Sequence, residues 1–491
     1  MTTISSLNAG LPVTSTSPSN TANSLASIGG AALADGNSGS GSTIVTIPSP
    51  SIESPLVYTQ DGTLEGGASA LTWAQSNTDA VSAVMAANYM AGSISGQFAN
   101  LGSALLDRFK TTGSDFSQSV TFSSAAAAVS MGQLIPNTNG DIKLTVVTTS
   151  GTKVNIELDS EGGKLGVSVN SSGPLTDPER TALASLANGF QQAINGLGAL
   201  QPTVNLSGLM QYNTSVLSSV DMQFNVGNAS GDFSANGSSR SLSLKDSSGT
   251  MNLKVNPSDS AILGSGAQQN EAIASYLKQF DSANAEGHGN AEMMEDFKDA
   301  FSQLMSNDGT SSQPTDPVAL SEQAMLTGLS DFTASLSESG SGTIGNPGTF
   351  DYQVSQSTDT EGDLQNGTIT QTQQSHLQAS YRQASSSSPG DYDDVQVDDN
   401  ASSTVKLATE RGILTQASLS QSHTKSTRNS EYVGGKLVPD VTTPTSTSDS
   451  KNLLTLLTPL IADGQAAQDS SAWQQMLSGI HGMILLNAGN D

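Results

Sequence analysis

The stretch from Gly140 to Leu200 constrains the fold most, because its apolar residues first alternate with polar ones and then recur every three or four positions. Alternation covers residues 142–146, 154–158 and 165–169, and turn-forming residues occupy 149–152 and 160–163 between these runs. A period of two residues is typical of a half-buried strand. The pattern therefore predicts a three-stranded antiparallel meander with one apolar face.

A helix is predicted directly after this meander. Thr176 or Asp177 is the expected N-cap, and Pro178 suits the first helical turn. Glu179 suits the positive end of the helix dipole. The apolar side chains on one side of the helix are Leu183, Leu186, Phe190, Ile194 and Leu197. This helix can therefore cover the apolar face of the meander.

The same two periods predict an α+β fold in which antiparallel meanders pack with amphipathic helices. Five parts are expected: a disordered leader at 1–55, a meander-plus-helix body at 72–306, a connecting helix at 317–337, a polar antiparallel β module at 349–438 and a C-terminal helical pair at 451–488. Residues 79–110 are expected to form one helix of the body, and residues 441–450 a Thr/Ser/Pro linker. The outward positions of the β module are Gln, Ser and Thr.

Composition limits the partners of the chain. Charged residues make up 13%, about half of the usual ~25%, and 18 Lys and Arg against 45 Asp and Glu leave a net charge of −27. This charge repels phosphate backbones and anionic membrane surfaces, so nucleic acid is not an expected partner. The chain has no cysteine, which excludes disulfides, thiol catalysis and cysteine-based metal sites. A protein partner or self-association remains open.

The first basic side chain is Arg108, whereas a secretory signal peptide needs a positive segment before its apolar one. No stretch approaches the ~18 apolar residues of a membrane span. The leader at residues 1–55 is rich in Ser, Thr, Gly, Asn and Pro, as in many exported bacterial proteins, and a solvated tail is the alternative. We therefore expect a secreted or cell-surface location by a signal-peptide-independent route, with the cytoplasm as the alternative.

One motif matches a cofactor signature literally. Residues Gly340–Gly345 read G-x-G-x-x-G, and Asp359 follows at a distance suited to a ribose contact. A dinucleotide site needs a strand before this loop and a helix after it, because the pyrophosphate binds at the helix N-terminus. Here a helix is predicted before the loop, and a strand pattern with Pro347 follows. The match is that expected by chance in a chain with 48 glycines, and no cofactor is predicted.

Five carboxylates crowd nine residues near the start of one predicted strand. They are Asp391, Asp393, Asp394, Asp398 and Asp399. Calcium is the cation that such a cluster would bind if the carboxylates converged. A solvated acidic edge is the alternative, and no EF-hand pattern is present.

The four histidines are His288, His376, His423 and His481, and none belongs to an H-E-x-x-H motif. His376 has the parity of the polar face of its strand, and His423 that of the apolar face. The chain also lacks G-x-S-x-G and Walker A motifs. A carboxylate pair for glycoside hydrolysis could assemble only in the fold, and aromatic platforms for sugars are scarce. No catalytic, cofactor-binding or metal-binding residue is therefore predicted.

Several local strings carry a resemblance. They are Leu105–Phe109 with Gly113–Val120, then Pro174–Arg180 and Val216–Asp221. Together they resemble a group of uncharacterised Gram-negative bacterial proteins, some of which are labelled lactate dehydrogenase. The resemblance covers about the central third of the chain. The label implies a nucleotide-binding strand-turn-helix with catalytic His and Arg, and none of these can be placed in this sequence.

These observations favour a non-enzymatic bacterial protein, exported or surface-associated, with a structural or interaction role. Two alternatives stay open. The first is a soluble enzyme, either the dehydrogenase that the label implies or a hydrolase. The second is a cytoplasmic scaffold.

Overall fold

The computed structural model describes residues 71–122, 139–197, 203–256, 262–306, 317–340, 343–345, 347–363, 365–385, 390–438, 440–457 and 471–486. All of them belong to one compact unit, Leu56–Asp491. The leader predicted at residues 1–55 lies outside the described residues. Among the helices that are described, none has the length and apolar character needed to span a membrane.

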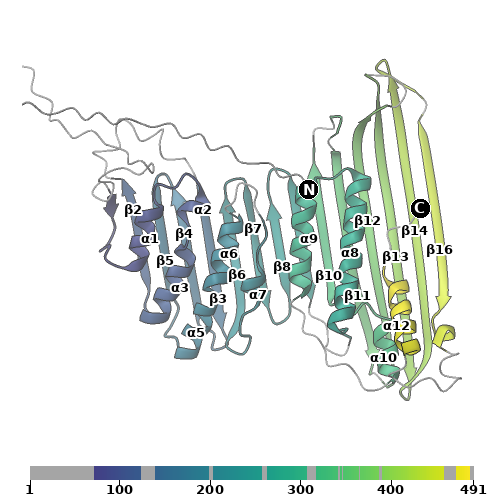
Figure 1. The fold of residues 1–491 in the computed structure, drawn as a ribbon, viewed down its shortest axis with the longest axis horizontal. Helices are drawn as coiled ribbons and strands as arrows, with labels where there is room; N and C mark the ends of the chain where they lie inside the picture. The colour runs from purple at the N-terminus through teal and green to yellow at the C-terminus, as the bar shows by residue number, and fades with distance from the viewer. Residues whose placement is uncertain are drawn as a thin grey trace, which may run out of the picture. The chain divides into compact units, whose positions relative to one another are not determined.

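The chain forms one sixteen-stranded antiparallel sheet (Figure 1). The shorter strands are β1 (Leu71–Trp73), β2 (Phe116–Phe122), β3 (Gly140–Thr148), β4 (Lys153–Glu161), β5 (Lys164–Ser171), β6 (Leu217–Val226), β7 (Ala229–Asn236), β8 (Arg240–Lys245), β9 (Gly249–Asn256) and β10 (Asp331–Ser339). The long strands are β11 (Pro347–Gly362), β12 (Gly367–Ala384), β13 (Tyr392–Glu410) and β14 (Ile413–Val433), with β15 (Lys436–Leu437) and β16 (Val441–Asn452) at their edge. Their order is β1-β2-β5-β4-β3-β6 and then sequential to β15, and β16 pairs with β14.

The helices lie against one face of this sheet (Figure 1). They are α1 (Ala80–Asn88), α2 (Ile94–Gln97), α3 (Leu101–Thr112), α5 (Asp177–Ser185), α6 (Ala187–Leu197), α7 (Ser207–Met210), α8 (Gly266–Gly287), α9 (Ala291–Ser306), α10 (Pro317–Ala324) and α12 (Ser471–Ile484). We call the face beneath them the covered face and the opposite one the open face. The predicted mixture of helices with antiparallel strands is confirmed.

The predicted meander is present as β3, β4 and β5, and the helix after it begins as expected. Thr176 is its N-cap and forms a capping box with Glu179. Ser150 Oγ also donates to Glu179 Oε1 at 2.6 Å. This hydrogen bond and those from Thr176 lower the pKa of Glu179 to about 2. The predicted single helix is divided at Leu186 into α5 and α6.

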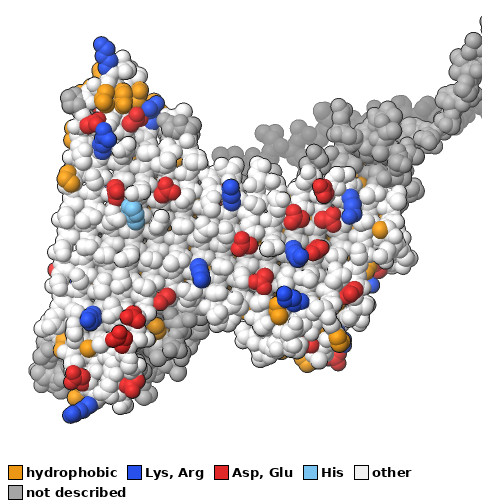
Figure 2. Space-filling model, turned by 180° about the vertical axis from the view of Figure 1, so that it is seen from behind, with side chains coloured by type: hydrophobic (Ala, Val, Ile, Leu, Met, Phe, Trp, Pro, Cys, Tyr) orange, Lys and Arg blue, Asp and Glu red, His pale blue; other side chains and the backbone are white. Residues whose placement is uncertain are grey.

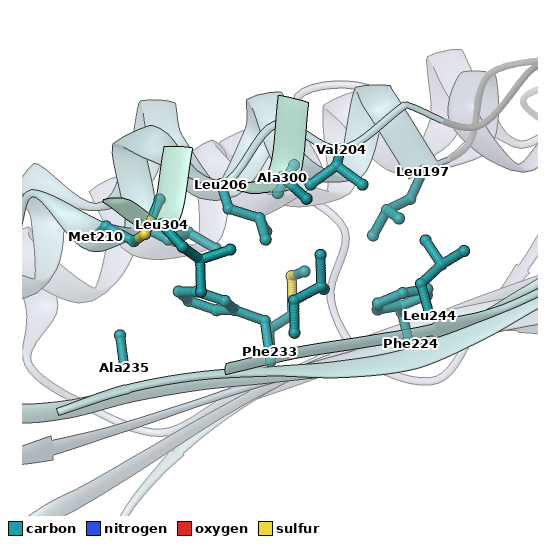
Figure 3. Packing of buried hydrophobic residues seen from close by; sticks show 14 of the residues in the cluster. Leu197, Val204, Leu206, Met210, Phe224, Phe233, Ala235, Leu244, Ala300 and Leu304 are labelled. Atoms are coloured by element: carbon teal, nitrogen blue, oxygen red, sulfur yellow. The ribbon is translucent and has the colours of Figure 1, made fainter. Parts of the chain in front are cut away.

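The core lies between the sheet and the helices. Phe224 and Phe233 rise from the sheet, and Leu197, Leu206 and Leu304 reach toward them from the helical layer (Figure 3). Farther along the sheet, the ring of Phe280 lies 5.1 Å from the rings of both Phe297 and Phe301. Packing of this kind requires close approach between elements. A Cβ on Gly102 would lie 2.8 Å from Phe190, for example, so α3 contacts α6 closely.

The connecting helix predicted at 317–337 is wrong in its second half. Helix α10 ends at Ala324, and Asp331–Ser339 is strand β10. Phe332, Ala334 and Leu336 are the buried apolar side chains of β10, and Glu338 is buried in the same phase. Phe332 and Leu336 are four residues apart, a spacing that fits a helix and a strand equally, so periodicity did not distinguish the two. Because β10 pairs with β9 and β11, the sheet runs on between the predicted body and β module.

Two other predictions are corrected. Residues 441–450 are not a linker, because they belong to β16, which pairs with β14 along twelve residues of each strand. Strand β16 reaches Asn452, and the predicted first C-terminal helix is described only as a helical turn at 454–457. Residues 79–110 form three helices instead of one, because the left-handed Asn100 (φ 60°) and the turn before Ile94 interrupt them.

Candidate functional site

The two faces of the sheet differ in chemistry because each strand alternates. In β11, Phe350, Tyr352 and Val354 are buried beneath the helices, whereas Asp351 and Gln353 are exposed on the open face. Figure 2 views the molecule from the side of the open face, where most side chains are uncharged and polar and charges are scattered. The outward Gln, Ser and Thr side chains predicted for residues 349–438 therefore lie largely on the open face.

A shallow groove of about 920 Å³ crosses the open face from β7 to β14. The open-face side chains that line it are Asp232, Ser241, Ser243, Asn252, Lys254, Thr333, Ser335, Gln353, Ser355, Gln374, His376, Asn400, Ser402, Ser422 and Thr424. Apart from one aspartate, one lysine and one histidine, all of these carry hydroxyl or amide groups. We call this feature the cross-strand groove.

Strand register arranges these side chains in two parallel rows. The first row is Asp232, Ser243, Asn252, Ser335, Gln353, His376, Asn400 and Thr424. The second is Ser241, Lys254, Thr333, Ser355, Gln374, Ser402 and Ser422. Neighbouring strands lie about 4.8 Å apart, so eight strands span roughly 34 Å. The groove is thus a long polar track at right angles to the strands.

Some groups of this track bond one another and others are free. Ser243 Oγ donates to Asn252 Oδ1 at 2.9 Å, and the hydroxyls of Ser402 and Ser422 are 2.9 Å apart. The side-chain amides of Gln353 and Gln374, by contrast, have no partner within the described part of the chain, and both residues are exposed. Each amide can donate and accept hydrogen bonds at once. The centre of the groove therefore presents unpaired donors and acceptors to solvent.

The groove lacks the geometry of nucleophilic catalysis. His376 Nε2 lies 3.3 Å from Asp398 Oδ1, and both side chains are partly exposed. A serine nucleophile needs a hydroxyl within hydrogen-bond reach of the histidine. Over the described ranges, no serine or threonine hydroxyl is hydrogen-bonded to His376.

A second hollow of about 470 Å³ lies beside the groove on the open face. Asp351, Gln378 and Asp398 form one row across β11, β12 and β13 at its wall. The two carboxylates are therefore two strand spacings apart, roughly 10 Å between backbones. Glycosidase carboxyl groups flank the scissile bond about 5–9.5 Å apart, and water is the reagent that they activate. Asp351 and Asp398 are both exposed at the wall of this hollow.

An apolar patch lies at the end of the long strands where β14, β15 and β16 meet. The rings of Tyr392 and Tyr432 stack with centroids 4.8 Å apart, and the Arg382 guanidinium lies 4.0 Å from the centroid of Tyr392. Leu437 and Val441 are more than half exposed nearby. Figure 2 shows apolar side chains gathered at this end of the molecule among charged ones.

Strand β13 divides the five carboxylates that the sequence crowds together. Asp394 and Asp398 are on the open face, and Asp393 and Asp399 are on the covered side. Asp391 directly precedes the strand, and its Oδ1 accepts from the amide of Gly434 at 2.8 Å. Arg382 donates two hydrogen bonds to Asp394, at 2.7 and 3.0 Å, and His423 Nε2 lies 2.7 Å from Asp399 Oδ1. The carboxylates thus diverge, and no group of three metal-ligating side chains converges within the described ranges. Calcium binding at this cluster is not favoured by the geometry.

The histidines occupy four separate environments. His376 is on the open face and His423 on the covered face, as their parity predicted. His288 is the C-cap of α8, and its ring stacks on Tyr381 with centroids 3.9 Å apart. His481 is buried, its Nδ1 lies 3.1 Å from the carbonyl oxygen of Leu326, and burial lowers its pKa.

The G-x-G-x-x-G motif connects two strands. Gly340 follows β10 and Gly345 precedes β11, so the element before the motif is a strand and not the helix predicted there. Asp359 lies within β11 opposite Thr370. Among the residues described here, the motif is followed by a strand, whereas a pyrophosphate site needs a helix N-terminus at this point.

Glutamines buried on the covered face were missed by pattern reasoning. Gln356, Gln371 and Gln373 are each at most 2% exposed. Gln373 Nε2 donates to the carbonyl of Ile484 at 2.9 Å, and Gln373 Oε1 accepts from the amide of Leu486 at 3.0 Å. These bonds hold the C-terminal end of α12 on the sheet. The only sequence signal is parity, since these glutamines share the phase of the apolar residues of their strands.

A small cavity of about 30 Å³ lies beneath α8, and its lining includes the polar side chains of Gln279, Tyr352 and His423. Gln279 Nε2 donates to Ser375 Oγ at 3.1 Å, and burial raises the pKa of Tyr352. Burial also raises the pKa of Glu286, whose carboxylate lies 3.1 Å from Lys425 Nζ at the border of this cluster. The space suits a water molecule and is too small for a substrate.

Comparison of the chain with protein-family models, curated proteins and solved structures gives no match. The resemblance to proteins labelled lactate dehydrogenase therefore stays a prediction. The cross-strand groove and the second hollow are the features of the described surface that are large enough to hold a ligand.

Proposed function

We propose that this chain is a non-enzymatic interaction protein, exported or associated with the cell surface, that meets its partner through the open face of the sheet. One observation carries the proposal, namely that a groove of about 920 Å³ lined by hydroxyl and amide side chains crosses eight strands of that face. Active sites are typically concave, largely apolar pockets with a few convergent polar groups. This groove is open and extended, and polar side chains line it on each strand that it crosses, which suits binding more than catalysis.

The charge distribution supports an exposed role. The chain as a whole is acidic, with 45 acidic and 18 basic residues. The groove is balanced by comparison, because Asp232 and Lys254 are the carboxylate and the ammonium group among its described lining residues. The net charge of −27 keeps such a protein soluble and separate from other anionic surfaces. The Ser/Thr-rich residues 1–55 are the proposed export signal.

Cell fractionation tests this location directly. Full-length protein and a variant lacking residues 2–55 are produced side by side, and medium, surface and cytoplasm are immunoblotted. We expect the full-length protein in the medium or at the surface and the truncated variant inside. Both forms confined to the cytoplasm would exclude the surface role and favour the cytoplasmic scaffold.

A hydrolase is the second candidate, because Asp351 and Asp398 share one row at the wall of the second hollow. The test is a screen of glycosidic substrates with the wild type and with Asp351→Asn and Asp398→Asn. We expect no turnover by any of the three proteins. Turnover by the wild type that falls at least a hundredfold in either variant would replace the interaction role with the hydrolase.

A further inference from the structure

We propose that the cross-strand groove binds a neutral, extended polysaccharide, with the polymer running across the strands. This inference rests on the proposed interaction role and names the ligand class of the same face. It starts from the two rows of polar side chains that register places across β7 to β14.

The chemistry of the rows disfavours the other common partners. Protein interfaces are enriched in Met and Arg and depleted in Ser, whereas the described residues that line the groove include neither Met nor Arg and are rich in Ser. Nucleic acid needs several cations for its phosphates, and among the described residues that line the groove Lys254 is the one lysine or arginine. A lipid surface needs exposed apolar groups, and the apolar residues that line the groove have the buried parity of their strands.

A neutral polysaccharide matches what the rows present. Hydroxyl and amide side chains donate and accept at once, as sugar hydroxyls do. The match of charge is also close, because one Asp and one Lys leave the two rows without net charge when His376 is neutral. An anionic polymer would gain little from a single lysine and would be repelled by a protein of charge −27.

The geometry favours an extended polymer over a small sugar. Successive side chains of one row are about 4.8 Å apart, a spacing comparable to the length of one sugar unit. The groove is shallow, and its described lining residues offer no aromatic ring on which a sugar could stack. Each sugar would therefore be held by hydrogen bonds alone, and each of these replaces one with water at little net gain. Binding strength must therefore accumulate along the track. We expect long chains to bind and short oligosaccharides of the same sugar to compete poorly.

The centre of the track is the place to test this. Gln353 and Gln374 lie on adjacent strands in the two rows, and both amides are exposed and unpaired within the described structure. The test variant is the double change Gln353→Ala with Gln374→Ala. The matched control is Asn225→Ala with Gln416→Ala, which removes two exposed amides from the open face outside the groove.

The measurement is affinity electrophoresis of the purified full-length chain through gels containing dextran, soluble starch, glucomannan, or the anionic polymers alginate and carboxymethylcellulose. We expect retardation by at least one neutral polymer and none by the anionic ones. The Gln353/Gln374 variant should bind at least fivefold more weakly, and the control variant should bind as the wild type does. Identical circular dichroism spectra and melting temperatures of the three proteins verify that the variants are folded.

Three outcomes would overturn the inference: no retardation by any neutral polymer, stronger retardation by the anionic polymers, or equal weakening in the test and control variants. None of them affects the fractionation experiment. A surface-located protein that ignores polysaccharides would keep the proposed interaction role and lose only the ligand class.

Discussion

The two ends of the covered face bury different kinds of side chain. Beneath α3, α5 and α6, strands β3 and β4 bury runs of Ile, Leu and Val. Beneath α8 and α12, strands β11 and β12 bury Gln356, Gln371 and Gln373 in addition to apolar residues. The first region is held chiefly by apolar packing, although Ser160 of β4 donates to Gln97 of α2 at 2.6 Å, and the second buries several glutamines of the sheet itself and depends more on hydrogen bonds between sheet and helices.

This difference shows what a glutamine needs in order to be buried. Burying an amide without partners is costly, whereas a satisfied amide is tolerated. Gln356 Nε2 donates to the carbonyl of Leu329 at 3.0 Å, and Gln356 Oε1 accepts from Thr327 Oγ1 at 2.9 Å. The glutamine region is thus specified by matched partners from three chain segments, which makes it more sensitive to the loss of one group.

The largest effect is expected in the apolar region from Phe190→Ala. Phe190 is fully buried in α6 against the close contact with Gly102 of α3. Removing its ring leaves a cavity, and we expect a loss of about 3–5 kcal/mol in the free energy of unfolding. Urea denaturation followed by far-ultraviolet circular dichroism measures it. A loss below about 1 kcal/mol would mean that this region is not held by packing.

A smaller loss is expected in the glutamine region from Gln373→Leu, which keeps the volume of the side chain. The change leaves the amide of Leu486 without its acceptor and removes a donor to Ile484. We expect a destabilisation of about 2 kcal/mol, concentrated at α12. Limited proteolysis and the fluorescence of Trp473, which is buried in α12, report release of that helix. Proteolysis and Trp473 fluorescence identical to those of the wild type would show that apolar contacts alone hold α12 on the sheet.

The third prediction concerns the pH dependence of stability, to which a buried carboxyl group of the covered face contributes. Burial raises the pKa of Glu338 to about 7, and its Oε2 accepts from the amide of Asn290 at 2.8 Å. Because the folded pKa lies above the unfolded one, the native state holds more protons between about pH 4.5 and 7, and stability falls as pH rises through this window.

Glu338→Gln should remove this part of the pH dependence and stabilise the protein at pH 8 by about 1–2 kcal/mol. Thermal melts of both proteins at pH 5 and pH 8 measure it. Asp296, whose pKa burial raises to about 6, should leave a smaller slope in the variant. An identical pH profile for wild type and variant would contradict the assignment to Glu338.

The smallest effect is expected from Gln374→Ala, one residue along β12 from Gln373. Gln374 is exposed on the open face, so its loss should change stability by less than about 0.5 kcal/mol. Together with Gln373→Leu, it compares the two faces at adjacent positions of one strand. Urea denaturation of both variants gives the loss in the free energy of unfolding for each. Similar losses in the two variants would mean that the faces do not differ as proposed.

Sequence patterns predicted much of the fold where local signals agree. The meander of β3 to β5 and the capping box at Thr176 follow from alternation and from helix-start residues close in sequence. Strand β7 was missed, because Ala229, Phe233 and Ala235 give it a weak apolar face broken by Gly231. The sequence of strand β16 has the composition of a linker, because every one of its residues is exposed and Pro444 interrupts it.

The candidate site was only half predictable. The alternation of apolar and polar residues predicted that Gln, Ser and Thr side chains would face outward between residues 349 and 438, and that His376 would be among them. It could not tell that Asp232 of β7 and Thr424 of β14 belong to one row, because that row exists only through the registers of seven strand pairs. Each register depends on turns and on packing of the opposite face.

By itself, the sequence determined the class of this protein: antiparallel strands with amphipathic helices, a cysteine-free interior and a strongly acidic, sparsely charged surface. These follow from residue types and their spacing along the chain. Only the tertiary structure decided that the strands join into one sheet, that the carboxylates of β13 diverge and that scattered hydroxyl and amide groups form a continuous track. The physical reason is that side chains from distant segments become neighbours only once hydrogen bonding fixes the order and register of the strands.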